Sequence, residues 1–504
     1  MNRGKKLAFN SLSSLIYQLI AIICGFILPR MYLTVYGSAV NGLITSITQF
    51  LGFISLCELG VGAVVQSALY KPLAENDTVG VSKIAISSER FFRRMAYILL
   101  AYTVLLMAFY PLKTIDSFEY GYTVLLILVM SVSTFAQYYF GMTYRLILSA
   151  DQLGFIHYTV HSITLVLNTV CCIILMQANA SVHIVKLVTS IIFLLQPICI
   201  SLIARRRYHI DRKIVLSEEP IKQKWNGLTQ HIASVVLGNT GTIVLTLMST
   251  LENVSIYGVY HLVVNGVKQI VLSLTNGIQA MMGNMLVKNE RKVLNQTFEF
   301  FEWIIHTGVT IIFAVTAFLI VPFVSVYTKG VTDVNYIVPT FAYLITLAQA
   351  AYCLRLPYNI MVLAAGHYKE TQWSAIIEAG INIVISVLAV NSWGLIGVAL
   401  GTIAAMLYRT VYLAWYLRSN IINRKFGYYL RHMVVNILTV AAFFLIVSLF
   451  ASFYSLTEQT YLEWIILAFK AGITCVLVAI PINLLCYRNL MIKMFSAVKN
   501  RIKK

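Results

Sequence analysis

The chain has 504 residues, of which 59% are hydrophobic and only 11% are charged, and its mean hydropathy is +0.79. Apolar stretches without a charged residue recur from one end to the other, as at 7–29, 121–144 and 304–328. A helix needs about 20 mostly apolar residues to cross a bilayer. Because the core of a water-soluble protein does not repeat such stretches throughout its length, the sequence predicts an all-α polytopic membrane protein.

In chain order, the hydrophobic pattern predicts about fourteen transmembrane helices. The uncharged stretch 379–408 is too long for one helix, and we divide it at the turn-forming residues 391–394. The expected helices lie at 7–29, 42–66, 95–112, 121–144, 156–177, 184–204, 228–250, 256–282, 303–325, 336–363, 373–391, 395–417, 432–453 and 463–487.

The distribution of basic residues predicts the orientation in the membrane. If the N-terminus is cytoplasmic and the number of spans is even, nearly all Lys and Arg residues fall on the cytoplasmic side, and only Arg30, Lys113, Lys186 and Lys329 fall outside. Cytoplasmic loops are enriched in Lys and Arg in this way, so we expect both termini in the cytoplasm. The net charge of +19 then serves to orient the protein and to contact anionic membrane lipids. No nucleic-acid partner is expected, because no soluble domain would hold one.

We expect two helical bundles with pseudo-two-fold symmetry. Residues 1–204 would form an N-terminal six-helix bundle and residues 228–417 a C-terminal one, joined by a charged cytoplasmic linker at 205–227. Residues 418–504 would add two helices and a basic cytoplasmic tail. Val-Tyr-Gly at 35–37 matches Ile-Tyr-Gly at 256–258, and Leu-Ser-Ala at 148–150 matches Leu-Ala-Ala at 363–365. Such internal repeats are typical of transporters that bind substrate between two related halves.

Ionisable side chains inside predicted spans are costly unless they are paired or hydrated, so they indicate candidate functional residues. Lys268 and Arg409 have no evident partner in the neighbouring sequence, and with Arg355 they would line a cationic cavity that receives a phosphate-bearing substrate. Glu58 and Glu378 are candidates for ion coupling or gating, and for Glu58 a structural role in capping or pairing is an equal alternative. A purely structural ion pair between Arg355 and Glu378 is an equal alternative.

Three further features bear on the site. Arg30, which follows Pro29 at the end of the first span, would either contribute to the cavity near an outer gate or anchor the helix at the interface. Lys470 would extend toward the membrane surface. The eight cysteines lie in apolar spans and are expected to pack there, so neither disulfides nor a metal site is expected.

The chain contains no phosphate-binding loop of the GxxxxGK[ST] type, and no Ser, His and Asp set can be assembled from its polar loops. A membrane glycosyltransferase or polymerase would normally need a sizeable loop outside the membrane to hold acceptor and chemistry. The outer loops predicted here are short. We therefore expect a protein that is not an enzyme.

Several short motifs, in their order along the chain, resemble Wzx-type polysaccharide flippases of the multidrug/oligosaccharidyl-lipid/polysaccharide exporter superfamily. The resemblance covers essentially the whole chain. Its motifs are short, and their order provides most of the specificity. They are Asn10, Leu28-Pro29-Arg30-Met31-Tyr32, Tyr36-Gly37, Asn41-Gly42-Leu43, Leu56-Cys57-Glu58-Leu59-Gly60-Val61-Gly62, Leu148-Ser149-Ala150-Asp151-Gln152 and Leu363-Ala364-Ala365-Gly366.

The resemblance implies a flippase of the bacterial plasma membrane. Such a protein moves undecaprenyl-diphosphate-linked oligosaccharide units across the membrane by alternating access, for O-antigen, capsule or exopolysaccharide assembly. A cationic cavity would hold the diphosphate and sugars while the lipid tail stays in the bilayer. The implied partners are this glycan carrier, membrane lipids, and the polysaccharide polymerase and chain-length machinery. No cofactor is implied, and coupling to H⁺ or Na⁺ is a theme of the superfamily.

Other functions stay open at this point. The first alternative is a cation-coupled multidrug antiporter of the same superfamily, which should carry unpaired acidic groups in its cavity. The predicted spans hold more Lys and Arg than carboxylates, which favours an anionic substrate. A membrane glycosyltransferase or polymerase is disfavoured by the short outer loops. A lipid II-type peptidoglycan flippase is a close relative of the leading hypothesis.

Overall fold

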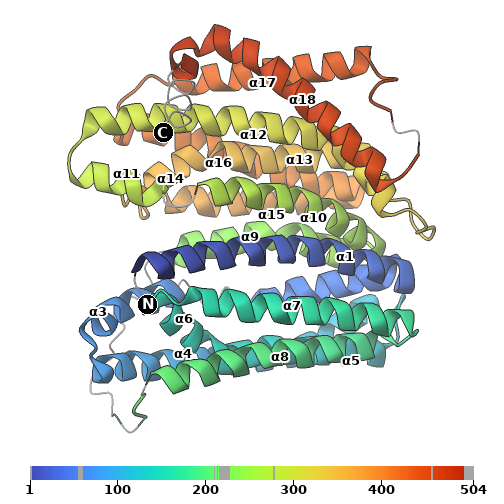
Figure 1. Ribbon diagram of the computed structural model, residues 1–504. Helices are drawn as coiled ribbons and strands as arrows, with labels where there is room; N and C mark the ends of the chain where they lie inside the picture. Colours follow the sequence, from blue (N-terminus) through green and yellow to red (C-terminus); the bar gives the residue numbers. More distant parts are fainter. Residues whose placement is uncertain are drawn as a thin grey trace. The chain divides into compact units, whose positions relative to one another are not determined.

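A computed structural model describes residues 3–54, 61–208, 210–212, 214, 228–275, 278–455 and 458–492. Every regular element in this part of the chain is helical, as the sequence predicts (Figure 1). The helices form two compact units, Met1–Ser255 and Ile256–Lys504. The predicted bundle boundaries at 204, 227 and 417 stay a prediction.

The first unit contains the helices up to α9. They are α1 (Arg3–Gly52), α3 (Val61–Glu75), α4 (Thr78–Thr114), α5 (Tyr120–Ala136), the π-helical turn η1 (Gln137–Gly141), α6 (Met142–Ala150), α7 (Gly154–Gln177), α8 (Val182–Arg207) and α9 (Leu228–Met248). Glycine at position 37, with φ of 83°, interrupts α1 and separates the first two predicted spans. α4 begins before the predicted span 95–112, and Asp77 caps its N-terminus. The Asp77 carboxylate accepts a hydrogen bond from the Gly80 amide at 2.9 Å.

The second unit begins inside α10 (Leu251–Leu274). It continues with α11 (Ile278–Val287), α12 (Arg291–Tyr327), α13 (Pro339–Leu354), α14 (Leu356–Ala364), α15 (Gln372–Trp393), α16 (Leu395–Asn420), α17 (Gly427–Leu449) and α18 (Tyr461–Cys486). The predicted span 256–282 is divided between α10 and α11, and the predicted span 336–363 is divided at Arg355.

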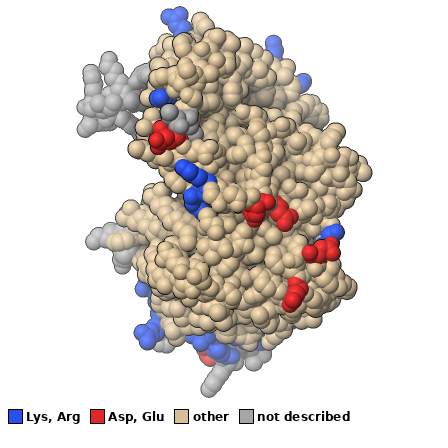
Figure 2. All heavy atoms as spheres, turned by 90° about the vertical axis from the view of Figure 1, so that its right-hand side faces the viewer, with Lys and Arg blue, Asp and Glu red and all other residues tan. Residues whose placement is uncertain are grey.

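Ten helices in the described ranges are long and apolar enough to cross a membrane. The predicted total of fourteen is not confirmed, because several predicted spans are broken into shorter helices. Many large apolar side chains stay exposed, such as Leu15 at 61% and Leu388 at 74%, as expected where lipid replaces water. Figure 2 shows one face on which Lys, Arg, Asp and Glu form a few separate groups among uncharged residues.

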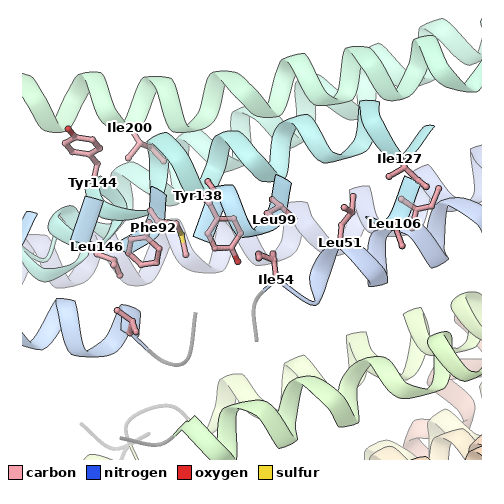
Figure 3. Packing of buried hydrophobic residues seen from close by; sticks show 14 of the residues in the cluster. Leu51, Ile54, Phe92, Leu99, Leu106, Ile127, Tyr138, Tyr144, Leu146 and Ile200 are labelled. Carbon is pink, nitrogen blue, oxygen red and sulfur yellow. The ribbon is translucent and has the colours of Figure 1, made fainter. Parts of the chain in front are cut away.

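A hydrophobic core fills the first unit, and its residues come from almost every helix there (Figure 3). Phe92, Leu99 and Leu106 repeat every seventh residue along α4 and are nearly or fully buried. They pack in one cluster with Leu51 of α1 and Ile127 of α5. This spacing places the three side chains on one face of α4.

The helices that precede the two matched turns of the predicted repeat end in the same way. After α6, Gln152 has φ of 58° and the Leu153 amide donates to the Leu148 carbonyl at 2.8 Å. After α14, Gly366 has φ of 77° and the His367 amide donates to the Val362 carbonyl in the same way. Both are left-handed C-terminal caps of the Schellman type. The same ending also follows α3 at Asn76, α7 at Asn179 and α11 at Asn289, and its hydrogen bonds equate Leu148 with Val362 rather than with Leu363. The predicted repeat therefore stays a prediction.

Candidate functional site

Three charged side chains that the sequence singles out meet inside the second unit. The Arg355 guanidinium donates through Nη1 to Glu378 Oε1, and Arg409 Nη1 donates to Glu378 Oε2 at 3.0 Å. Arg355 and Arg409 are each 7% exposed, and Glu378 is 2% exposed. One carboxylate thus bridges two guanidinium groups from different helices.

Lys268 joins this cluster through an aromatic ring. Its ammonium lies 5.2 Å from the centroid of Tyr352, and the Arg355 guanidinium lies 4.3 Å from the same centroid. Cations are attracted to the negative face of an aromatic ring. Among the described residues no carboxylate forms an ion pair with Lys268. We call Lys268, Tyr352, Arg355, Glu378 and Arg409 the cationic cluster.

Proline at position 357 helps to place Arg355. Because proline has no backbone N–H, the helix cannot continue its regular hydrogen bonds through this point. α13 ends with Arg355 as its C-terminal cap, and α14 begins with Pro357 in its first turn. Arg355 therefore lies at a helix break within the predicted span.

Small residues bring α15 and α16 close enough for Glu378 and Arg409 to meet. A Cβ atom at Gly397 would lie 2.4 Å from the Ala389 carbonyl oxygen, and one at Gly401 would lie 2.3 Å from Ser386 Oγ. Small residues at helix interfaces permit such close approach in membranes. Thr410 also donates to the Ala351 carbonyl at 3.0 Å, which joins α16 to α13.

The cationic cluster has positive charge in excess and spare hydrogen-bonding capacity. It contains three cations and one carboxylate, and that carboxylate pairs with the two arginines but not with Lys268. Arg409 Nε is buried without a hydrogen-bond partner, as is the Nδ2 of Asn382 one turn along α15 from Glu378. Buried polar groups are normally satisfied, and an uncompensated buried charge is costly. Both features suit an arrangement whose partner is an anion.

The structure brings together Lys268, Arg355, Glu378 and Arg409, and it supplies a partner for Arg409 that lies 31 positions earlier in the chain. Both the structural ion pair and the cationic grouping that the sequence suggests for Arg355 are present. Arg30 lies in the first unit on α1, where it is half-buried. Glu58 lies outside the described residues. Sequence reasoning missed Tyr352, although its position three residues before Arg355 on a helix would have indicated contact.

No protein-family model and no curated protein matches the sequence. Solved structures of similar fold do. The chain matches the lipid II flippase MurJ in an inward closed conformation with a TM-score of 0.69 and 14% identity, over 96% of this chain and 99% of that one.

Two transporters of the MATE family also match. An inward-facing multidrug resistance MATE transporter of the MOP superfamily gives a TM-score of 0.60 at 14% identity, over 80% of this chain and 94% of that one. A eukaryotic MATE transporter gives 0.59 at 11% identity, over 83% and 96%. The chain is therefore a multi-pass membrane protein with the fold that MurJ and the MATE transporters share.

Proposed function

We propose that this protein is a flippase that moves undecaprenyl-diphosphate-linked oligosaccharide units across a bacterial plasma membrane. The observation that carries the proposal is the excess of positive charge in the cationic cluster, buried within a fold shared with a lipid II flippase and with exporters. A diphosphate is an anion that matches this charge. Arg supplies planar paired donors to phosphate oxygens, and Lys supplies a point charge.

Glu378 gives the cluster a way to exchange partners. Without substrate, its two oxygens accept hydrogen bonds from Arg355 and Arg409, and its single charge offsets only one of theirs. A diphosphate would compete for the same guanidinium donors and for the free Arg409 Nε–H. Glu378 would then be left without its cations in a buried place and would favour uptake of H⁺ or Na⁺. This exchange would couple substrate binding to an ion and would support alternating access.

The expected context follows from the same proposal. Both termini would lie in the cytoplasm, and the carried unit would serve O-antigen, capsule or exopolysaccharide assembly together with a polymerase and its chain-length machinery. A cation-coupled multidrug antiporter is the second candidate, because MATE transporters share the fold. A cavity for cationic drugs should be rich in carboxylates, and the cationic cluster has one carboxylate against three cations.

The test is deletion of the gene in its host, followed by complementation with wild type, Lys268→Ala and Arg409→Ala. Lys470→Ala is the matched control, because that lysine also lies in a helix but donates to the Phe453 carbonyl at 3.1 Å. We expect the two cluster variants, at normal protein levels, to leave lipid-linked units in the inner leaflet and to abolish surface polymer.

The outcomes separate the candidates. Normal surface polymer with altered drug sensitivity in the deletion strain would favour the antiporter. Accumulation of lipid II with cell lysis would favour a peptidoglycan precursor as the substrate. Full rescue by both cluster variants would remove the cationic cluster as the binding site.

A further inference from the structure

A second buried charge cluster lies in the second unit around Glu302 of α12, which is 0% exposed. Arg424, in the connection between α16 and α17, donates through Nη1 to Glu302 Oε2 at 2.6 Å and through Nη2 to Oε1. His432 of α17 places its Nε2 at 3.3 Å from Glu302 Oε2. None of these three residues belongs to the cationic cluster, and no motif in the sequence singles them out.

Two histidines stack beside this carboxylate. The rings of His306 and His432 have centroids 4.7 Å apart and planes inclined by 22°. His306 Nε2 lies 2.9 Å from the Tyr358 hydroxyl, and its Nδ1 accepts from Asn436 at 3.0 Å. His432 Nδ1 lies 2.8 Å from the Tyr487 hydroxyl. We call Glu302, His306, His432 and Arg424, with these polar partners, the histidine cluster.

The partners of the two imidazoles allow a proton to enter without breaking a hydrogen bond. A tyrosine hydroxyl both donates and accepts, and an asparagine amide can present either its oxygen or its NH₂ group. A neutral imidazole accepts at one nitrogen, whereas the protonated ring donates at both. Tyr358, Tyr487 and Asn436 can reverse their roles when a ring gains a proton. Only one ring would be charged at a time, because two imidazolium groups 4.7 Å apart would repel.

One full positive charge is enough to balance the single negative charge of Glu302. Burial would lower the pKa of Arg424, but its hydrogen bonds and attraction to Glu302 raise it above the usual value, so the guanidinium stays charged. Its side chain is 15% exposed, whereas that of His432 is 5% exposed. Arg424 is thus the member of the cluster that can leave toward solvent. A buried Glu302 without Arg424 would need another positive charge.

We propose that the histidine cluster is a proton-binding site in which one proton, held by the His306–His432 pair, and the guanidinium of Arg424 are alternative counter-ions of Glu302. Protons from solvent would reach the cluster at the end of the unit that carries the α16–α17 connection. Binding moves one proton from water to an imidazole nitrogen and changes no other bond. The proposal goes beyond the proposed flippase function and does not depend on it.

The other charged and titratable groups around the cluster are few. Glu299 of α12 also attracts Arg424, Arg431 of α17 lies over the Tyr487 ring at 4.6 Å, and the Tyr429 ring contacts Tyr358. None of these groups makes a described ion pair with Glu302. Arg424 and the two histidines are therefore the groups that can balance the charge of Glu302, and Tyr358 adds a hydrogen bond to the same carboxylate.

Proton binding would act on the attachment of α17 and α18 to α12. Trp303, next to Glu302, donates through its indole to Asn483 of α18 at 2.8 Å, and Thr307 donates to the same oxygen at 3.0 Å. Tyr487, the residue that follows α18, contacts His432. Release of Arg424 on protonation would free the α16–α17 connection while the histidines still hold α17 and α18 to Glu302.

The experiment measures proton binding by the purified full-length protein without substrate. Intrinsic fluorescence is recorded between about pH 8 and about pH 5, the range in which histidine titrates, and Trp303→Phe identifies the part of the signal that comes from Trp303. We expect a one-proton transition in wild type. Glu302→Gln should lose it, because the neutral amide no longer attracts a proton, and His432→Gln should lose or strongly weaken it.

Arg424→Gln gives the decisive result. Removing the competing guanidinium should move the midpoint to higher pH by at least about one unit, a tenfold tighter binding of the proton. In a purely structural cluster, both Glu302→Gln and Arg424→Gln would lower the stability of the protein. Arg424→Gln would then not move the midpoint of the transition to higher pH. His367→Gln is the matched control, because His367 contacts the Tyr416 hydroxyl at 2.9 Å and forms no described ion pair with a carboxylate.

An unchanged midpoint in Arg424→Gln, or a full transition in His432→Gln, would overturn the proposal. If Glu302→Gln does not fold, as judged by size-exclusion chromatography, the results for Arg424→Gln and His432→Gln still decide. Because no substrate is present, these results are independent of the complementation test, and either proposal can fail without the other.

Discussion

At the scale of single residues, Glu378 shows how one buried carboxylate can control two cations. Arg355 approaches it from the break after α13 and Arg409 from α16, and all three side chains are less than a tenth exposed. A buried ion pair contributes little net stability when complete, but breaking it leaves an uncompensated charge. Glu378 is therefore important for folding as well as for the proposed ion exchange.

Glu378→Gln should lower the free energy of unfolding by about 3–5 kcal/mol, because two guanidinium groups would remain buried without their counter-ion. Thermal unfolding of the protein in detergent measures this loss. Lys268→Gln is the control and should change stability much less, since no carboxylate pairs with Lys268 among the described residues. Equal stability of the two variants would show that Glu378 does not balance the arginines.

Lys268→Gln has a different expected effect, which is on substrate binding. Removing its point charge leaves Arg355, Glu378 and Arg409 in place, so binding of a soluble diphosphate should weaken about tenfold, the loss of one charge-assisted contact. Isothermal titration calorimetry with inorganic pyrophosphate checks this. Undiminished pyrophosphate binding would place the phosphate elsewhere.

At the scale of helices, glycine decides how closely α15 and α16 pack. Positions 397 and 401 have no room for a Cβ atom, and their contacts include the backbone of α15 at Ala389 and Ser386. An added side chain would push the helices apart. The distance between Glu378 and Arg409 would then increase, so helix packing and the cationic cluster are linked.

Gly401→Val should destabilise the protein by about 1–3 kcal/mol through overpacking and should also impair complementation. Gly380→Val on α15 is the matched control, because no atom lies within 4 Å of the Cβ position there. Thermal unfolding and the surface-polymer assay report the two effects. A Gly401→Val protein as stable and active as the control would contradict the role of close packing.

At the scale of the whole molecule, charge is expected to set the orientation in the membrane. The turn at 151–152 follows α6, and the turn at 116–118 follows α4, so consecutive long helices place these turns at opposite ends of the first unit. Asp151 is surrounded by bases, with Lys6 Nζ at 2.9 Å and Arg207 Nε at 3.7 Å. A basic end of this kind is expected to stay in the cytoplasm.

Reporter fusions test this orientation. Green fluorescent protein inserted after Gln152 should fluoresce, whereas alkaline phosphatase inserted after Ser117 should be active, because each reporter works on one side of the membrane only. Fusions at the N- and C-termini should behave like the one after Gln152. The reverse pattern would invert the predicted topology.

The sequence determined much of the element content of this protein. Its apolar stretches predicted a helical membrane protein, because every backbone polar group in a bilayer must be satisfied within a helix or closed barrel. The depth of Lys268, Arg355 and Arg409 in such stretches marked them as candidates. Breaks inside spans were harder to predict. Pro357 divides one predicted span, whereas Pro322 is accommodated within the unbroken α12.

Only the tertiary structure decided which charges meet. Glu378 lies 23 positions from Arg355 and 31 from Arg409, and the contacts depend on how α13, α15 and α16 pack. The same holds for the histidine cluster, where Glu302 and Arg424 are 122 positions apart. Hydrophobic periodicity is a local property that a sequence displays directly. The pairing of distant side chains depends on helix breaks and close glycine contacts, which become evident only when the helices are packed.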